Sequence, residues 1–264
     1  VILALSGMKH ADRSKRLAHY SKFFDHVVVV GDAEGAPFLW TTGRSGSGLS
    51  GYGIRNFALQ PAARMAKRAV DLLLGMIGMV VVAPLFLTIA LLIRTDSPGP
   101  VFFRQQRMGR EGRVFTVLKF RTMYRNAHAM LQEILDTDPE KRREYEHYHK
   151  LQEDPRVTPI GRVLRRFSLD ELPQLLNVLR GDMSLVGPRA YMPSELPKMN
   201  GLSRAVLQTP PGITGLWQVS GRNNIHFEGR VDLDVHYIQN WSPWLDLYLL
   251  VRTIPVVLTG KGAS

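Results

Sequence analysis

Two adjacent acids carry the clearest chemical signal in this sequence. Asp170 and Glu171 lie within the segment Arg165–Arg189, which reads RRFSLDELPQLLNVLRGDMSLVGPR and places four arginines around them. Nearby cations favour ionised carboxylates and attract an anionic substrate. Side-by-side carboxylates can supply a nucleophile and can hold a hard cation such as Mg²⁺. We therefore interpret Asp170 as a candidate nucleophile and Glu171 as its partner.

The same spacing also has a purely structural interpretation. Ser168 and Glu171 match the capping box, in which each side chain satisfies a free amide at the start of a helix. Pro173 argues against one continuous helix, because its ring would clash with the carbonyl of Leu169. We expect a separate tight turn at SLDE, then a helix over Pro173–Leu179 that Gly181 ends. Spacing alone supports capping and catalysis equally.

Composition narrows the class of partner. The chain has 264 residues, with 34 Lys and Arg against 23 Asp and Glu, and a formal charge of +11. A balance this basic indicates a polyanionic partner, which is nucleic acid, an anionic membrane surface or a phosphorylated small molecule. The absence of cysteine excludes disulfides and thiolate metal sites.

One segment is apolar enough to enter a membrane. Leu72–Ile93 carries no charge over about 22 residues, which is enough to cross a hydrocarbon core of roughly 30 Å. A single transmembrane helix is one interpretation. However, Lys and Arg flank the segment on both sides, which places both ends on the cytoplasmic face. Pro84 near its middle disrupts helical hydrogen bonding. We therefore favour a re-entrant helix–break–helix hairpin over about residues 67–95, with the break at Ala83 and Pro84.

A basic β-hairpin is expected after this segment. An apolar run, a turn at Gly109–Gly112 and an alternating strand over Val114–Phe120 form the pattern. Candidate substrate-binding donors occupy its ends: Gln105, Arg107, Lys119 and Arg121. An alternative is a basic surface that rests on lipid headgroups.

Helices are expected in the remaining parts. Residues 125–135 and 139–151 are helical stretches with solvated faces, and Asp138 is the expected N-cap of the second. Trp241, Trp244 and Tyr248 lie about one helical turn apart near the C-terminus, which suits a helix in the membrane interface. Packing of these aromatic residues into a core remains the alternative.

The chain divides into three parts on this basis. Residues 1–42 contain the apolar runs Val1–Leu5 and Phe23–Val30, typical of buried strands, and we expect the remnant of a Rossmann-like α/β domain there. The glycine- and serine-rich residues 43–60 are expected to form a linker. Residues 61–264 are expected to form an α-rich α/β, membrane-associated catalytic domain with the re-entrant hairpin and interfacial amphipathic helices.

Four long motifs occur in an order that resembles a known family. They are KFRTM at Lys119–Met123, SLDELPQLLNVLRGDMSLVGPR at Ser168–Arg189, PGITGLWQVSGR at Pro211–Arg222 and NWSPWLDLYLL at Asn240–Leu250. Together they resemble the bacterial sugar transferases, which are the polyprenyl-phosphate phosphoglycosyl transferases of the monotopic superfamily. The resemblance covers residues 60–264, and the N-terminal part is similar to the large members, of the galactose phosphotransferase type.

The resemblance implies an activity and a set of site residues. It implies Mg²⁺-dependent transfer of hexose 1-phosphate from a UDP-hexose to undecaprenyl phosphate, through a phosphosugar on Asp170 and with release of UMP. Glu171 would be the partner acid and a metal ligand with Asp170, and Arg165 the basic residue ahead of the dyad. Substrate would be bound by the donors named above together with Arg189, Gln218 and Arg222. The family also implies the cytoplasmic face of the bacterial inner membrane, contact with its lipid, and a homodimer.

Two positions depart from the family pattern. Ala83 precedes Pro84 where small members have serine, and Ala190 follows Arg189 where a second proline is usual.

Galactose is the first choice of sugar, with glucose second, in a surface-polysaccharide pathway. The alternatives are a non-catalytic membrane scaffold, which a lost dyad would favour, and nucleic-acid binding, which the long apolar segment argues against.

Overall fold

The N-terminal part of the chain forms a small sheet. The computed structural model describes residues 2–4, 19–20, 23–24, 26–30, 41–46, 49–55, 58, 60–148, 151, 153–221 and 225–259. The strands are β1 (Ile2–Ala4), β2 (His26–Val30), β3 (Thr41–Gly46) and β4 (Leu49–Arg55), in the spatial order β1-β2-β4-β3. β1 and β2 are parallel, whereas β4 is antiparallel to both β2 and β3.

Most of the stretch that was expected to be a linker forms two strands of this sheet. Most of the glycine- and serine-rich stretch lies in the β3–β4 hairpin, because ladder hydrogen bonds come from the backbone and glycine does not prevent them. The parallel β1–β2 pair is of the kind that an α/β unit contains. A Rossmann-like origin, and the domain boundaries, stay predictions.

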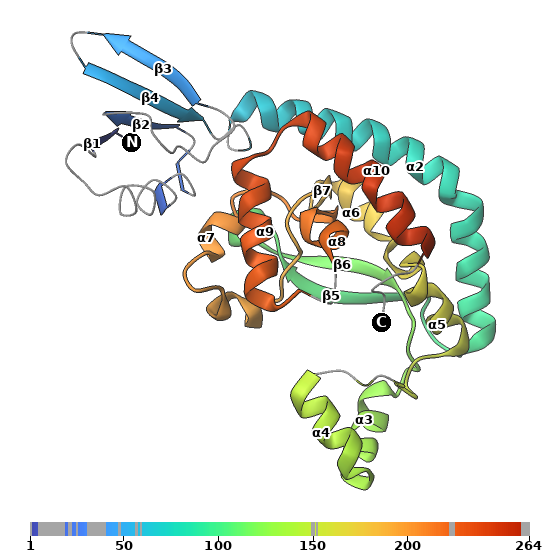
Figure 1. Ribbon diagram of the computed structural model, residues 1–264. Helices are drawn as coiled ribbons and strands as arrows, with labels where there is room; N and C mark the ends of the chain where they lie inside the picture. Colours follow the sequence, from blue (N-terminus) through green and yellow to red (C-terminus); the bar gives the residue numbers. More distant parts are fainter. Residues whose placement is uncertain are drawn as a thin grey trace.

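The helix α2 (Pro61–Asp96) forms one long side of the molecule. It is a single helix of 36 residues with Pro84 in its interior, and Figure 1 shows it running along the body and then turning sharply. Proline is an established cause of such bends. The predicted break is therefore a bend within one continuous helix. Among the described residues, α2 is the one helix long and apolar enough to cross a membrane.

Both halves of α2 pack on the same body. Before the bend, Gly75 approaches Val178 and Leu179, and after it Ile89 and Ile93 are buried against Phe120. Around the bend the helix is bare, with Val80 and Val81 exposed by 75 % and 72 %.

The basic hairpin forms as expected. β5 (Phe102–Met108) pairs antiparallel with β6 (Val114–Phe120), and the short helix η2 (Arg110–Gly112) connects them. A projecting arm follows, made of α3 (Ala127–Thr137) and α4 (Pro139–Tyr148) (Figure 1). Asp138 caps α4 by accepting from the amides of Glu140 and Lys141, as predicted.

The body of the molecule is completed by short elements around a two-stranded parallel sheet. After α5 (Pro159–Arg166), η3 (Leu169–Glu171) and α6 (Gln174–Arg180), β7 (Ser184–Val186) pairs with β8 (Gly212–Thr214). Between and after these strands lie η4 (Pro193–Met199), α7 (Ser203–Val206), α8 (Leu216–Ser220), α9 (Phe227–Gln239) and α10 (Pro243–Thr259).

The C-terminal aromatic residues divide between the two expected environments. Trp241 is buried in the core with Tyr237, Ile238 and Leu249, so the core alternative holds for it. Trp244 and Tyr248 lie on α10 and are exposed, Trp244 by 78 %. α10 lies beside the first half of α2 in Figure 1, and Lys67 of α2 forms an ion pair with Asp246 of α10. The ion pair holds α10 against the first half of α2, so the exposed apolar side chains of both helices lie on one packed helix pair.

Candidate active site

The acid pair lies in a short turn of its own. Leu169–Glu171 forms a 3₁₀ turn, Ser168 before it has a φ of 54°, and α6 begins only at Gln174. Within the described part of the chain the Ser168 side chain makes no capping hydrogen bond. Gly181 ends α6 with a φ of 96°, as predicted. The capping-box interpretation is therefore wrong, and Ser168 shapes the turn through its backbone.

Two leucines fix this turn to the second half of α2. Leu169 and Leu172 flank the acids, and both pack against the cluster of Ile89, Ile93 and Phe120. Burial of each leucine contributes about 1.5–3 kcal/mol when complete. The acids are consequently held at a defined position beside the membrane-type helix.

Lys119 on β6 reaches the acid pair. Its Nζ donates to Glu171 Oε1 at 2.7 Å. The position of α6 against β6 is set by Asn177, which is 0 % exposed. The Asn177 amide donates to the Thr116 carbonyl at 2.8 Å and accepts from the Leu118 amide at 3.0 Å. Because buried amides are costly to leave unpaired, Asn177 is a positioning residue for the contact between Lys119 and Glu171.

Arg165 is placed by the start of α5. Thr158 caps α5 by accepting from the Gly161 amide, and the Thr158 amide donates to the Thr122 carbonyl at 3.0 Å. Arg165 then donates from Nε to Thr122 Oγ1 at 2.9 Å, and its charge acts on Asp170. Gly161 allows this close approach, since a Cβ there would lie 2.1 Å from the Thr122 carbonyl oxygen.

Gly161→Ala is predicted to displace α5 and lower both stability and activity. Overpacking of this kind costs about 1–3 kcal/mol, and the displacement moves Arg165 away from Asp170. Thermal unfolding in detergent and the rate of product release would measure the two effects. Gly78→Ala is the control, because its Cβ would meet no described atom within 4 Å and alanine favours helix. A melting temperature of Gly161→Ala equal to that of wild type would contradict this account of α5.

Removal from water is the largest influence on the pKa of Asp170. Burial raises the pKa of Asp170 to about 6. The positive charge of Lys119 opposes this rise, as does that of Arg165, whereas the negative charge of Glu171 adds to it. The cations near Asp170 favour its ionised form, as the sequence indicated, but removal from water outweighs them. A poorly hydrated carboxylate that still ionises near neutral pH suits a nucleophile.

A group of arginines lies beyond the acid pair. Arg107 donates to the Ala190 carbonyl at 3.1 Å and to Gln105 Oε1 at 2.7 Å, and Glu195 lies 3.7 Å from it. Burial and then the charge of Arg189 lower the pKa of Arg107, while Glu195 and then Glu171 raise it. The acids, Lys119, Arg165, Arg107 and Arg189 therefore form one electrostatic neighbourhood, and their roles in catalysis and substrate binding stay predictions.

Two arginines lie close to the ring of Trp217. The Arg189 guanidinium is 5.1 Å from the Trp217 ring centre, and the Arg230 guanidinium is 5.3 Å from it. Cation–π attraction to the same ring stabilises both side chains, although their charges repel each other. Arg230 is on α9 and gave no signal in the sequence, whereas Trp217 belongs to a motif that did.

Comparison with known proteins gives the family. The family described as bacterial sugar transferase matches residues 62–260. The chain belongs to the bacterial sugar transferase family. The exopolysaccharide production protein ExoY of Sinorhizobium fredii is 43 % identical over 206 residues, which are 78 % of this chain and 91 % of that protein.

Two further relatives differ in length and in the sugar that they are named for. The undecaprenyl-phosphate galactose phosphotransferase of Salmonella typhimurium is 42 % identical over 210 residues, or 80 % of this chain and 44 % of that protein. The UDP-glucose:undecaprenyl-phosphate glucose-1-phosphate transferase of Caulobacter vibrioides is 41 % identical over 214 residues, 76 % of this chain and 73 % of that protein. This sugar transferase therefore matches relatives named for either hexose.

Two of the predicted substrate residues of this sugar transferase hydrogen-bond to backbone carbonyls, and a third lies outside the described residues. Arg121 is buried and donates to the carbonyls of Ser97 and Pro98, so it fastens the end of α2. Gln218 donates to the Ile213 carbonyl at 3.3 Å. Arg222 lies outside the described residues.

The donor set fits a magnesium ion that shares its ligands with a substrate. Among the described residues no group of three or more His, Cys, Asp or Glu side chains could enclose a metal. Mg²⁺ is commonly held by one or two carboxylates plus phosphates and water. Asp170 and Glu171 supply those two carboxylates, and Mg²⁺ binding there stays a prediction.

The Arg189 loop is tied to a buried acid on α9. Asp234 is fully buried and its Oδ2 accepts from the Arg189 amide at 2.9 Å and from the Tyr191 hydroxyl at 2.8 Å. Its Oδ1 has no hydrogen-bond partner among the described residues. Burial raises the pKa of Asp234 to about 7, against the opposing effect of these two donors.

We predict that this acid makes stability fall as the pH rises from about 4 to about 7. In that window the folded protein keeps the Asp234 proton and the unfolded chain loses it, so the free energy of unfolding decreases, by up to about 4 kcal/mol. Asp234→Asn should remove this part of the pH dependence, measured by thermal unfolding across the window. Asp136→Asn, at an exposed site, is the control. An unchanged slope in Asp234→Asn would contradict the prediction.

Proposed function

We propose that this protein transfers a hexose 1-phosphate from a UDP-hexose to undecaprenyl phosphate, through a covalent phosphosugar on Asp170. The observation that carries the proposal is the position of Asp170, which is partly buried beside Lys119 and Arg165 in a turn fixed to α2. The family membership and the names of the relatives support the same reaction. This reaction would begin the membrane stage of surface-polysaccharide synthesis.

The proposed reaction has two displacements at one phosphorus atom. An Asp170 oxygen attacks the phosphorus that bears the hexose, and the bond to UMP breaks, with UMP leaving as an anion. The phosphate oxygen of the lipid then attacks the same phosphorus and releases the Asp170 carboxylate, giving a lipid diphosphate-linked hexose. Lys119, Arg107 and Arg189 would bind the phosphate oxygens and stabilise their developing charge, and their proximity to the acid pair and to one another supports this role. A bound Mg²⁺ would neutralise phosphate charge so that a carboxylate can approach.

A single site for a soluble and a lipid substrate requires a shallow membrane position. The two halves of α2 pack on α6 and on α5, which are close in sequence, so both ends of α2 are held by one body. The bare bend, together with exposed Trp244 and Tyr248 on α10, would enter the lipid. We therefore propose a re-entrant α2 and a catalytic domain on the cytoplasmic face of the inner membrane.

The expected topology can be measured with reporter tags. A tag before Ala69 and a tag after Ser264 should both be accessible from the cytoplasm in spheroplasts and inverted vesicles. A tag on a known periplasmic loop of another protein serves as the control. Tags on opposite sides would show that α2 spans the membrane, and would contradict the re-entrant arrangement.

Galactose is the sugar that we propose first, with glucose as the second candidate. Two relatives named for galactose match 80 % of this chain at 42 % and 43 % identity, slightly above the 41 % and 40 % of two relatives named for glucose. A panel of UDP-sugars, assayed for UMP release in the presence of undecaprenyl phosphate and Mg²⁺, tests this choice. Release of UMP from no UDP-sugar would overturn the proposed function and favour the non-catalytic scaffold.

A further inference from the structure

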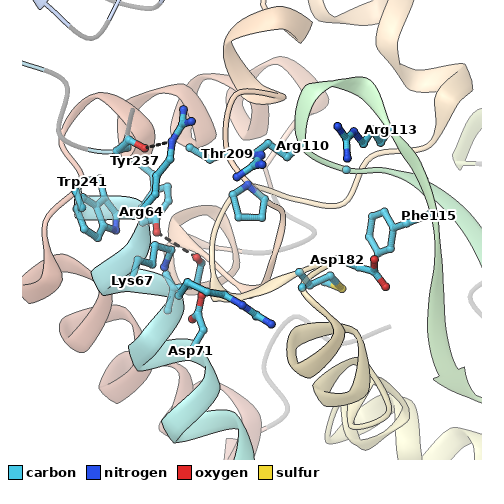
Figure 2. Close-up of a pocket in the computed structure, with 18 residues that line it drawn as sticks. Arg64, Lys67, Asp71, Arg110, Arg113, Phe115, Asp182, Thr209, Tyr237 and Trp241 are labelled. Carbon is cyan, nitrogen blue, oxygen red and sulfur yellow. Dashed lines mark hydrogen bonds between the residues drawn. The ribbon is translucent and has the colours of Figure 1, made fainter. Parts of the chain in front are cut away.

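A basic cavity lies apart from the acid pair. It has a volume of about 350 Å³ and is bounded by the start of α2, the β5–β6 turn, the end of α6 and the end of α9 (Figure 2). Phe115 lines it, whereas Lys119, four residues further along β6, contacts Glu171. At about 3.3 Å per residue, the cavity and the acid pair are roughly 13 Å apart along this strand.

The charged side chains around the cavity are mainly cationic. Five basic residues line it, against the two acids Asp71 and Asp182: Arg64, Lys67, Arg68, Arg110 and Arg113. The first three come from α2 and the last two from the β5–β6 turn, so positive charge faces the cavity from two elements (Figure 2). Asp71 accepts from the Leu185 amide at 3.0 Å. The three α2 cations also have partners, because Lys67 pairs with Asp246 while Arg64 and Arg68 donate to backbone carbonyls. The two arginines of the β5–β6 turn are therefore the cations most available to a ligand.

The turn that carries two of these cations is fixed in place. The Gly109 amide donates to the Arg113 carbonyl at 2.7 Å, and the Glu111 amide donates to the Leu207 carbonyl at 2.7 Å. Arg110 and Arg113 form ion pairs with Glu111 at 3.2 and 3.7 Å, where Glu111 is half exposed. Such surface pairs contribute little and are readily exchanged for a better anion.

A buried hydroxyl completes the donor set. Thr209 lines the cavity next to the Leu207 anchor and is only 8 % exposed. Its Oγ1 has no hydrogen-bond partner among the described residues, although buried hydroxyls are normally paired. A ligand oxygen in the cavity would satisfy it.

We propose that this cavity binds a phosphate group, separately from the reaction at Asp170. Guanidinium groups from different directions and a hydroxyl donor match a tetrahedral anion with several oxygens. The phosphate has two possible sources, an anionic phospholipid headgroup or a soluble phosphate ester. The apolar side chains Val70 and Leu73 are exposed on α2 beside the cavity residues Lys67 and Asp71, which supports the lipid source.

Binding can be measured without any turnover. The full chain in neutral detergent would be titrated by calorimetry with short-chain phosphatidic acid, diacylglycerol of the same chain length, and glycerol phosphate. All proteins would carry Lys119→Met, so that a phosphate bound at the acid pair does not contribute. Because no UDP-sugar is present, the result is independent of the proposed function.

The expected binding affinities distinguish specific binding in this cavity from non-specific attraction to the positive charge of the protein. Arg110→Gln with Arg113→Gln should weaken phosphatidic acid binding at least about tenfold, since charge-assisted hydrogen bonds are lost. Thr209→Val should weaken it about three- to tenfold without lowering the melting temperature, since the hydroxyl has no partner within the described chain. Arg143→Gln with Arg204→Gln, at exposed sites on α4 and α7, is the charge-matched control and should leave binding unchanged.

Each outcome decides between the alternatives. Binding of phosphatidic acid alone supports a lipid headgroup, and equal binding of glycerol phosphate supports a soluble ester. Binding that is the same in the Lys119→Met parent, in Arg110→Gln with Arg113→Gln and in Thr209→Val overturns the proposal. Equal loss in the control pair, or binding of diacylglycerol as tight as that of phosphatidic acid, also overturns it.

Discussion

Asp170→Asn should lower the rate of UMP release at least about 10³-fold, because the amide cannot form the covalent intermediate. The fold should persist, since asparagine has the same shape and the turn is held by Leu169 and Leu172. The measurement is UMP release from the preferred UDP-hexose, with the melting temperature measured in parallel.

The control for this substitution is an acid away from the site. Asp136 lies on the projecting arm with its side chain 68 % exposed, so Asp136→Asn should retain full activity. Turnover of Asp170→Asn near that of wild type would show that Asp170 is not the nucleophile.

Lys119→Met should have the second largest effect, a loss of about 10²- to 10³-fold in kcat/KM. Removal of one preorganised donor from a site that stabilises developing charge typically costs this much. Glu171→Gln should be similarly impaired, and the double variant should be less impaired than the product of the two losses, because the side chains are hydrogen-bonded. Steady-state kinetics of the four proteins would give this coupling.

A matched control tests whether the effect comes from the site. Lys141 lies on α4 in an exposed ion pair with Asp138, so Lys141→Met should keep wild-type kinetics. Full additivity of Lys119→Met and Glu171→Gln would mean that the two side chains act independently.

Local sequence rules accounted for the turn at the acid pair. Pro173 and Gly181 predicted a separate turn followed by a short helix, and the structure has both. The β5–β6 hairpin and the Asp138 cap were predicted for the same reason, since their signals lie within a few residues of one another.

Features that depend on tertiary packing were not predictable. The burial of Asp170 outweighs its basic neighbours, and burial depends on α2 and β6, which are distant in sequence. The same holds for Arg121, which fastens the end of α2, and for Arg230, which meets Trp217 only when α9 and α8 pack together. The glycine-rich hairpin was missed because strand pairing by the backbone leaves no side-chain pattern. The homodimer stays a prediction.

The most direct test of the central claim is the intact mass of the protein after mixing with a UDP-hexose and Mg²⁺, without lipid acceptor. We predict a mass increase equal to one hexose phosphate, located on Asp170 after proteolysis, and removed when undecaprenyl phosphate is added. Asp170→Asn should show no increase. Product formation by wild type with no such adduct, or an adduct on another residue, would contradict the account.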